Sequence, residues 1–332
     1  MSLPTIWVAM AVCFVSSTVM AVSLEKPYYE LNDAENLFRD FVKQHGKKYD
    51  RKEYSERLEF FKETLKDINW RNEMFPNTVF AVNHFADLRP EELQQYLGFR
   101  PLNGTVKKVS ILKSDEPVTA PDAHDWRQHG KVSHVKDLGQ CGSSFIFSAI
   151  GNIEGQYAMK HEQCLALSEG QAHECGQDGD PHEVMNDLAK RCPDEKAGIM
   201  TEADYPYDDS EPPCQENCGK AVVKVLKGER IDVPSEDTLK QKLYDIGPLS
   251  VGLNAVDLLH YKSGILEPNR CKGKEPNYAV LLVGYGEENG TPFWIIKNAW
   301  GEKFGEQGYV RLRRRVNACV MGTSYTATAI VA

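Results

Sequence analysis

The chain has 332 residues, of which 41% are hydrophobic and 26% charged, the balance of an ordinary soluble globular protein with room for more than one folding unit. Its formal net charge is −9. This charge argues against nucleic acid as the main partner, because binding to phosphates needs clustered cations.

The chain opens with a largely apolar stretch, residues 1–21, that contains no acidic side chain. The stretch is short for a membrane span and ends in small residues, with Val19 and Ala21 spaced like a signal-peptidase site. We therefore predict a secretory signal peptide over residues 1–21. No Lys or Arg precedes the apolar run, which departs from the usual signal peptide, and a signal anchor is the alternative, against which the early small-residue cleavage pattern speaks. Through the secretory pathway, the expected destination is the extracellular space or the lysosomal lumen.

Residues 22–100 are rich in charge and follow a helical period. Residues 32–49 and 52–75 both place apolar side chains at the spacing of one helix face. Residues 78–88 alternate like a short strand, and residues 88–99 indicate a short helix with Pro90 near its start. We predict a mainly helical N-terminal domain over this region.

Residues 101–120 have no clear period and contain Pro, Gly and Ser, so they indicate a linker and processing region. We expect the mature chain to begin between about Asp115 and Asp122. Two Asn-Gly-Thr triplets, at Asn103 and Asn289, are potential glycosylation sites in loop-like surroundings.

Residues 121–332 begin with helical patterns and end in strands. The segment from Ser144 to Lys160 is predicted to be a helix, and a Gly-, Pro- and Cys-rich middle follows it. The segments "YAVLLVGYG", "FWIIKNAW" and "GYVRLRRR" have the composition of strands. Helices first and strands last predict an α+β domain with segregated elements.

A series of motifs runs through the whole chain in a fixed order. The N-terminal domain carries Glu53, Arg57, Phe61, Thr64, Ile68 and Asn72, followed by Ala81, Asn83, Phe85 and Asp87. The segments "HDWRQHGKVSHVKDLGQCGSSFIFS", "LSEGQAHEC", "YPYDDSEPPC", "NYAVLLVGYG" and "WIIKNAWGEKFGEQGYVRL" come after them. In these motifs the chain resembles the papain-like cysteine proteases, and most of all the cathepsin L-like zymogens, although the family usually has Asn at Thr64. The resemblance implies a papain-like two-domain fold over residues 121–332, with a helical left half, a β-barrel-like right half and a cleft between them, preceded by a helical inhibitor-type propeptide.

The family's catalytic positions are occupied here by other residue types. The nucleophilic cysteine, the basic histidine and the glutamine that donates to the oxyanion correspond to Ser144, Tyr278 and Leu138, while Asn298 matches the asparagine that orients the histidine. A hydroxyl is a far weaker acid than a thiol, a phenol with a pKa of about 10 does not shuttle protons near neutrality, and a leucine donates no hydrogen bond. No histidine of residues 121–332 falls opposite Ser144, so each is expected on the surface or in a loop. The sequence therefore predicts a catalytically inactive homologue, a secreted binding or regulatory protein.

The resemblance also implies which residues shape the cleft. Trp300 and Met185 are expected to line it. The family has a Gly-Cys-x-Gly-Gly stretch whose backbone pairs with the substrate, and the matching residues here are Gly179–Glu183, with Asp180 at the cysteine position. Side chains are therefore expected where a substrate backbone would approach closely.

Eight of the nine cysteines remain after Cys13 leaves with the signal, and an even number in a secreted chain suggests disulfides. The resemblance implies the pairs Cys175–Cys214 and Cys271–Cys319. The four others, Cys141, Cys164, Cys192 and Cys218, allow three pairings. We favour Cys192–Cys218, because both flank the same connecting segment.

Two other functions stay open. One is residual or altered peptidase-type hydrolysis through Ser144, or through Cys141, whose thiol has lost its family partner and lies three residues before the nucleophile position. The other is a structural or storage role. We expect no cofactor, no metal and no contact with nucleic acid or, after signal removal, with a membrane. A protein or peptide ligand, such as an active cathepsin, is the expected partner, and the oligomeric state is open.

Overall fold

The computed structural model describes residues 25–97, 119–176, 179–191, 198–210, 212–215, 218–271, 274–322 and 325–332. The predicted signal peptide, most of the linker and Asn103 therefore lie outside the described residues. Asn289 is exposed in the turn between two strands. Among the helices of the described residues, none has the length and apolar character needed to cross a membrane.

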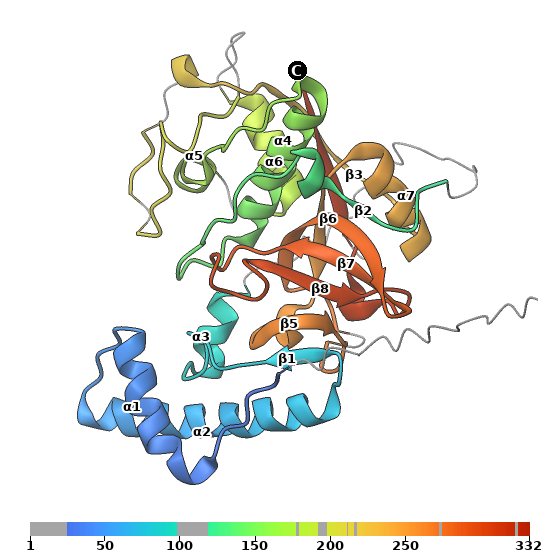
Figure 1. The fold of residues 1–332 in the computed structure, drawn as a ribbon. Coiled ribbons are helices and arrows are strands. Elements are labelled where there is room, and N and C mark those ends of the chain that lie inside the picture. The colour runs from blue at the N-terminus through green and yellow to red at the C-terminus, as the bar shows by residue number, and fades with distance from the viewer. Residues whose placement is uncertain are drawn as a thin grey trace, which may run out of the picture.

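The N-terminal region is mainly helical, as its periodicity predicts (Figure 1). It contains α1 (Ala34–Gln44), α2 (Arg51–Met74), β1 (Thr78–Phe80) and α3 (Pro90–Gln95), after a short 3-10 turn, η1 (Leu31–Asp33). Asp50 caps α2 by accepting from the backbone N–H groups of Lys52 and Glu53, both at 2.8 Å. The aromatic rings of Phe38 and Phe61 lie 5.2 Å apart and hold α1 against α2.

The strand predicted over residues 78–88 is only three residues long. The side-chain amide of Asn72 binds the last residue of this strand. It donates to the carbonyl of Phe80 at 2.9 Å and accepts from the N–H of Phe80 at 2.8 Å. The register of the strand's pairing with β5 shifts between Val79 and Phe80, where the regular ladder ends. The strand itself pairs antiparallel with β5, and Thr78 donates to the carbonyl of Ile265 at 2.6 Å. The N-terminal region thus adds an edge strand to the sheet of the rest of the chain.

The remainder of the chain has a helical part and a sheet part, which confirms the predicted α+β class. The helical part contains α4 (Ser144–His161), α5 (Glu169–Cys175) and α6 (Pro181–Lys190). The sheet part contains β2 (His124–Asp125), β3 (Val225–Arg230), β4 (Leu249–Leu253), β5 (Tyr261–Leu266), β6 (Tyr278–Glu288), β7 (Thr291–Lys297), β8 (Tyr309–Arg313) and β9 (Thr326–Val331), with α7 (Glu236–Ile246) beside it. Short 3-10 turns are η2 (Trp126–His129), η3 (Cys218–Lys220), η4 (Ala255–Asp257) and η5 (Ala318–Val320).

The strands follow the order β1-β5-β8-β7-β6-β4-β9-β3, and β2 pairs with β6. The pairing of β5 with β8 is parallel and the other pairings are antiparallel. Helix α4 is buried along most of its length, and Ile146, Ile150 and Ile153 pack in one cluster with residues of α6 and β9. Figure 1 shows this helix beside the strands, where it joins the two parts.

The structure forms both disulfides that the resemblance implies, Cys175–Cys214 and Cys271–Cys319. The third predicted pair, Cys192–Cys218, includes Cys192, which lies outside the described residues. Cys141 and Cys164 carry thiols instead of disulfides.

One expectation about the cleft is wrong, and the segment at the family's substrate-pairing stretch has a different structure. Met185 lies on α6 and is fully buried in the core, so it does not line a cleft. Residues 179–183 do not form an extended wall, because Pro181 begins α6 and Asp180 is its N-cap. The Asp180 carboxylate accepts from the Glu183 N–H at 3.1 Å, and Glu183 accepts in return from the Asp180 N–H at 3.3 Å. The residue at the family's cysteine position therefore stabilises a helix start.

Candidate active site

Ser144 is the first residue of α4 and has no exposed surface. Its hydroxyl oxygen accepts from the backbone N–H of Ala279, at 3.2 Å. The buried hydroxyl therefore joins α4 to β6, and it is inaccessible in the zymogen.

The other residues at the family's catalytic positions are buried with it. Tyr278 and Leu138 have no exposed surface, and the Tyr278 ring lies 5.0 Å from that of Trp300. Burial, with the charge of Asp137 adding to it, raises the pKa of Tyr278 well above its ordinary value, although the Ala299 backbone opposes this. The phenol stays protonated and does not act as a base.

Asn298 is present but orients no imidazole. It is 3% exposed, and within the described part of the chain neither its side-chain oxygen nor its nitrogen has a hydrogen-bond partner. The four residues at the family's catalytic positions are therefore close together but form no thiol–imidazole pair.

A thiol–imidazole pair exists a short distance away. The sulfur of Cys141 lies 3.2 Å from Nε2 of His173, and both residues are half-buried. This is the separation at which a nucleophile and its base share a hydrogen bond. The expectation that every histidine of residues 121–332 lies on the surface or in a loop is wrong for His173, which stands on α5.

The loop before α4 sets the position of Cys141. Gly139 has a φ of +64°, and its N–H donates to the carboxylate of Asp137 at 3.0 Å. A Cβ at this glycine would lie 2.3 Å from the Asp209 carboxylate, so no other residue fits here without displacing that side chain. The N–H of Gln140 also donates to Asp209, at 3.3 Å. Asp209 thus anchors the backbone directly before the thiol.

Helix α5 sets the position of His173. Ser168 caps the helix by accepting from the N–H of Gln171 at 2.9 Å. The disulfide between Cys175 and Cys214 holds the other end. The imidazole is thus carried by a short helix that is fastened at both ends.

Tyr207 lies beside the pair. Its hydroxyl donates to the carbonyl of Leu138 at 3.1 Å and lies 3.3 Å from the hydroxyl of Ser143. Its ring is 5.5 Å from that of His173. Burial raises the pKa of Tyr207, and Cys141 adds to the shift while the hydrogen bond with Ser143 opposes it. The phenol therefore remains a hydrogen-bond donor.

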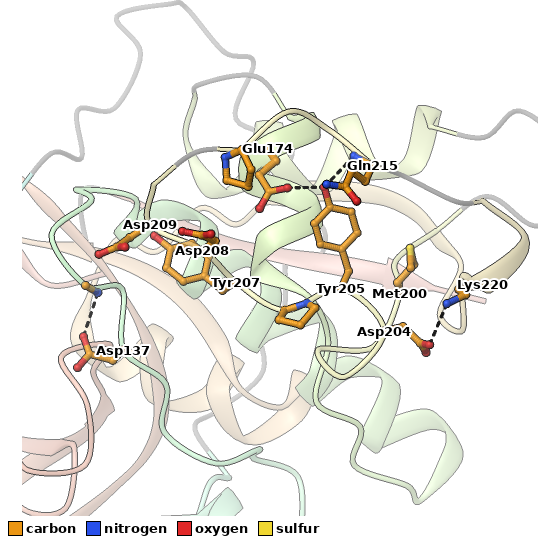
Figure 2. A pocket seen from close by; sticks show the side chains of 13 residues that line it. Asp137, Glu174, Met200, Asp204, Tyr205, Tyr207, Asp208, Asp209, Gln215 and Lys220 are labelled. Atoms are coloured by element: carbon orange, nitrogen blue, oxygen red, sulfur yellow. Dashed lines mark hydrogen bonds and ion pairs between the residues drawn. The ribbon is translucent and has the colours of Figure 1, made fainter.

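A cavity of about 690 Å³ adjoins this group (Figure 2). Its charged lining residues are Asp137, Glu174, Asp204, Asp208, Asp209 and Lys220. Lys220 pairs with Asp204 at 3.5 Å, and Tyr205 donates to Glu174. Figure 2 shows Tyr207 next to Asp208 and Asp209 in the wall. Five carboxylates against one ammonium give the cavity a negative potential.

A second cavity, of about 1170 Å³, lies between the N-terminal region and the rest of the chain. Trp300 lines it, as expected for a cleft residue, and packs its ring 4.8 Å from that of Phe85. Gly139 and Gln140 also line this cavity. The N-terminal region therefore reaches the loop that carries Cys141.

Comparison with known proteins identifies the family. The model of the papain family cysteine proteases matches residues 120–329, and that of the cathepsin propeptide inhibitor domain (I29) matches residues 38–93. The chain belongs to the papain family of cysteine proteases. Together with the N-terminal region, this makes it a cathepsin L-like zymogen with a propeptide.

Curated relatives and solved structures agree with this family. The viral cathepsin of Heliothis zea nuclear polyhedrosis virus is 38% identical over 327 residues, which cover 92% of this chain and 87% of the relative. The viral cathepsin of Spodoptera litura multicapsid nucleopolyhedrovirus is 35% identical, and the match covers 94% of this chain and 95% of the relative. The structure of digestive procathepsin L 3 of the Tenebrio molitor larval midgut matches with a TM-score of 0.76 at 29% identity, over 89% of this chain and 98% of that one. Procathepsin L2 from the same source matches with a TM-score of 0.79 at 27% identity, over 89% and 99%.

These relatives overturn one prediction from the sequence. The chain was expected to be an inactive homologue, but relatives at 33–38% identity over most of its length carry the name viral cathepsin, and this points to a papain-family enzyme. The sequence analysis weighs His173 with the other histidines only as a partner of Ser144, and it keeps Cys141 as an alternative nucleophile without a base. The position of His173 two residues before a disulfide cysteine is the available signal of a partner for Cys141.

Proposed function

We propose that the chain is a peptidase in which Cys141 is the nucleophile and His173 is the general base. The observation that carries this proposal is the 3.2 Å contact between the thiol and Nε2 of the imidazole. Ser143, the N-cap of α4, follows two residues after Cys141, and the positive end of a helix favours a nearby thiolate. A thiol is also the most reactive side chain available for attack on a carbonyl at neutral pH.

The proposed reaction needs no cofactor. Nε2 of His173 takes the proton from the Cys141 sulfur, and the thiolate attacks the scissile carbonyl carbon to give a tetrahedral oxyanion. The intermediate collapses as the C–N bond breaks, and the imidazolium gives its proton to the leaving amine. Water, activated by the same imidazole, then attacks the thioester and releases the acid and the thiol. One residue thus moves the proton in both halves of the reaction.

Tyr207 is the side chain best placed to stabilise the oxyanion. Its hydroxyl lies among the hydroxyl of Ser143, the imidazole ring and the Cys141 loop, and its raised pKa keeps it protonated. Its one proton goes to the Leu138 carbonyl in this structure and has to turn from there to the oxyanion. Tyr207 replaces in this role the glutamine that the family places where Leu138 stands.

Tyr207→Phe should therefore lower kcat by about 100-fold with little change in KM, because removal of one oxyanion donor costs about that much and the ring is retained. Steady-state kinetics on a fluorogenic peptide measure both constants. Tyr205→Phe is the matched control in the same cavity, since its hydroxyl faces Glu174. Equal losses in the two variants would remove Tyr207 from the reaction.

The acidic cavity favours peptides with a cationic side chain near the scissile bond. We expect kcat/KM to be about 10-fold higher for Arg- or Lys-containing fluorogenic peptides than for their Glu counterparts, and the ratio to shrink as salt screens the field. The same experiment tests the function itself, with the linker-processed chain and a peptidyl electrophile that is mapped by mass spectrometry. No hydrolysis of any peptide and no label on Cys141 would refute the proposal. Hydrolysis without charge preference would refute only the role of the cavity.

We also place the enzyme on the secretory route, as a zymogen destined for the extracellular space or the lysosome. The apolar residues 1–21 and the family membership support this placement. N-terminal sequencing of material from the medium tests it.

A further inference from the structure

A buried cluster of charged side chains joins the segments that carry Cys141 and His173. Its centre is Lys136, whose ammonium donates to both carboxylate oxygens of Glu169, at 2.8 and 2.7 Å, and to Glu154 at 2.9 Å. All three side chains are at most 7% exposed. Lys136 also donates to the carbonyl of Leu167 at 2.7 Å. The ammonium is therefore fully coordinated within the protein.

This cluster connects the two segments that carry the reactive pair. Lys136 stands five residues before Cys141, directly ahead of the anchored loop that begins at Asp137. Glu169 is the first residue of α5 and His173 is four residues later, so the two share one face of the helix one turn apart. The bidentate ion pair thus holds the start of the Cys141 loop against the start of α5.

Resting on the proposed function, we infer that Lys136 and Glu169 are positioning residues, which hold the Cys141 thiol and the His173 imidazole at hydrogen-bond distance. Neither touches the reacting atoms. Catalytic pairs lose efficiency steeply when they are displaced by an ångström, so a rigid link between their two carriers has a direct effect on turnover.

Other charged side chains surround the Lys136–Glu169 ion pair and balance its charges. Glu154 comes from α4, and Lys297, from the end of β7, lies 4.0 Å from it and donates to Ser133 at 2.8 Å. Glu202 approaches Lys136 to 3.9 Å and pairs with His134 at 3.2 Å on the solvent side. Two buried acids thus face two buried lysines, and the cluster needs no further counter-ion.

The carboxylate of Glu169 titrates within the working pH range. Burial raises its pKa to about 7, with Glu154 adding to the shift and Lys136 opposing it. Burial also works against the charge of Lys136, but the two carboxylates outweigh it and hold the pKa of Lys136 above its ordinary value. On acidification through pH 7 the proton therefore goes to Glu169, and the charged link to Lys136 is weakened.

The test is the pH dependence of Cys141 alkylation by iodoacetamide, followed by peptide mapping, in a Cys164→Ser background that removes the exposed thiol. An imidazole held at the thiol makes it react below the ordinary thiol pKa of about 8.5, and His173→Ala abolishes that reaction. Glu169→Gln, which keeps the shape but not the charge, should slow alkylation at pH 8, where the parent carboxylate is ionised, by about 10-fold, should match the parent at pH 6, and should lower kcat more than it raises KM. It should also remove the titration near pH 7.

Lys297→Met is the matched control. It removes a buried cation from the same cluster but touches neither the Cys141 loop nor α5, so alkylation at pH 8 should stay within about threefold of the parent. If Glu169→Gln does not fold by circular dichroism, Glu169→Asp keeps the charge and draws the carboxylate back by one methylene, and should give an intermediate slowing. Equal alkylation profiles of the parent and a folded Glu169 variant, or equal slowing by Lys297→Met, would overturn the positioning role. If His173→Ala leaves the alkylation rate of Cys141 unchanged, the proposed function is overturned instead. The experiment therefore distinguishes failure of the positioning role from failure of the proposed function.

Discussion

Cys141→Ala is expected to lower kcat/KM by about 10⁴-fold or more, whereas Ser144→Ala should leave it within about threefold of the wild type. The thiol is half-buried beside an imidazole, while the hydroxyl of Ser144 has no exposed surface and is engaged by the N–H of Ala279. The effect is large because without the sulfur no covalent intermediate forms. Fluorogenic peptide kinetics on the processed chain measure it.

His173→Ala should cost nearly as much, and the double variant no more than either single one, because residues that act as a unit are not additive. Loss of one buried hydrogen bond makes Ser144→Ala somewhat less stable, so thermal unfolding is recorded in parallel. Activity that survives in Cys141→Ala but disappears in a folded Ser144→Ala would assign catalysis to the serine.

The sequence predicted well those features that depend on local periodicity. The helix starting at Ser144 and the two helices before Thr78 follow from apolar spacing. Helix α6 was accessible in the same way, because Asp180, Pro181 and Glu183 form the signature of a capped helix start. The resemblance to the family draws attention to a substrate-pairing stretch at these residues, and the placement of Met185 in the cleft, which it implied, is wrong.

The reactive pair was not predictable in this way. Cys141 and His173 are 32 residues apart, and neither lies in a pattern that indicates their contact. Their distance depends on the path of the loop around Gly139, on the disulfide at Cys175 and on the buried Lys136 cluster. Such a contact is fixed by tertiary structure, and the one sign of it in the sequence is that Cys141 lacks the cysteine with which the family pairs this position.

A buried ion pair joins the propeptide to the rest of the chain, and its loss should strongly weaken the binding of the propeptide. A guanidinium nitrogen of Arg71 on α2 donates to the carboxylate of Asp257 at 3.1 Å and to its carbonyl at 2.9 Å, and both side chains are fully buried. The guanidinium lies 3.8 Å above the ring of Phe80. Burial lowers the pKa of Arg71 to about 10, with Asp257 opposing, so it stays charged at neutral and acid pH.

Arg71→Leu should weaken the docking of the propeptide by about 100-fold or more, because breaking a buried pair costs about 3–5 kcal/mol. The change leaves the mature part intact, since the other carboxylate oxygen of Asp257 accepts from the N–H groups of Asn269, Arg270 and Cys271 within that part. In the docked state, however, it leaves the Asp257 carboxylate buried without its cation. The measurement uses the full chain nicked in the linker by an added protease, with the fraction of bound propeptide followed by size exclusion on dilution.

Asp67→Asn is the matched control at the same interface. Asp67 on α2 pairs with Arg270, but this pair is 18% and 43% exposed, and exposed pairs contribute about 0.2–1 kcal/mol. The control should therefore change the dissociation constant by no more than about fivefold. The two substitutions remove charges of opposite sign from one helix, so a non-specific effect of net charge would move them in opposite directions. A dissociation constant for Arg71→Leu no weaker than that of Asp67→Asn would show that apolar packing around Phe85 and Trp300, rather than the buried pair, holds the propeptide in place.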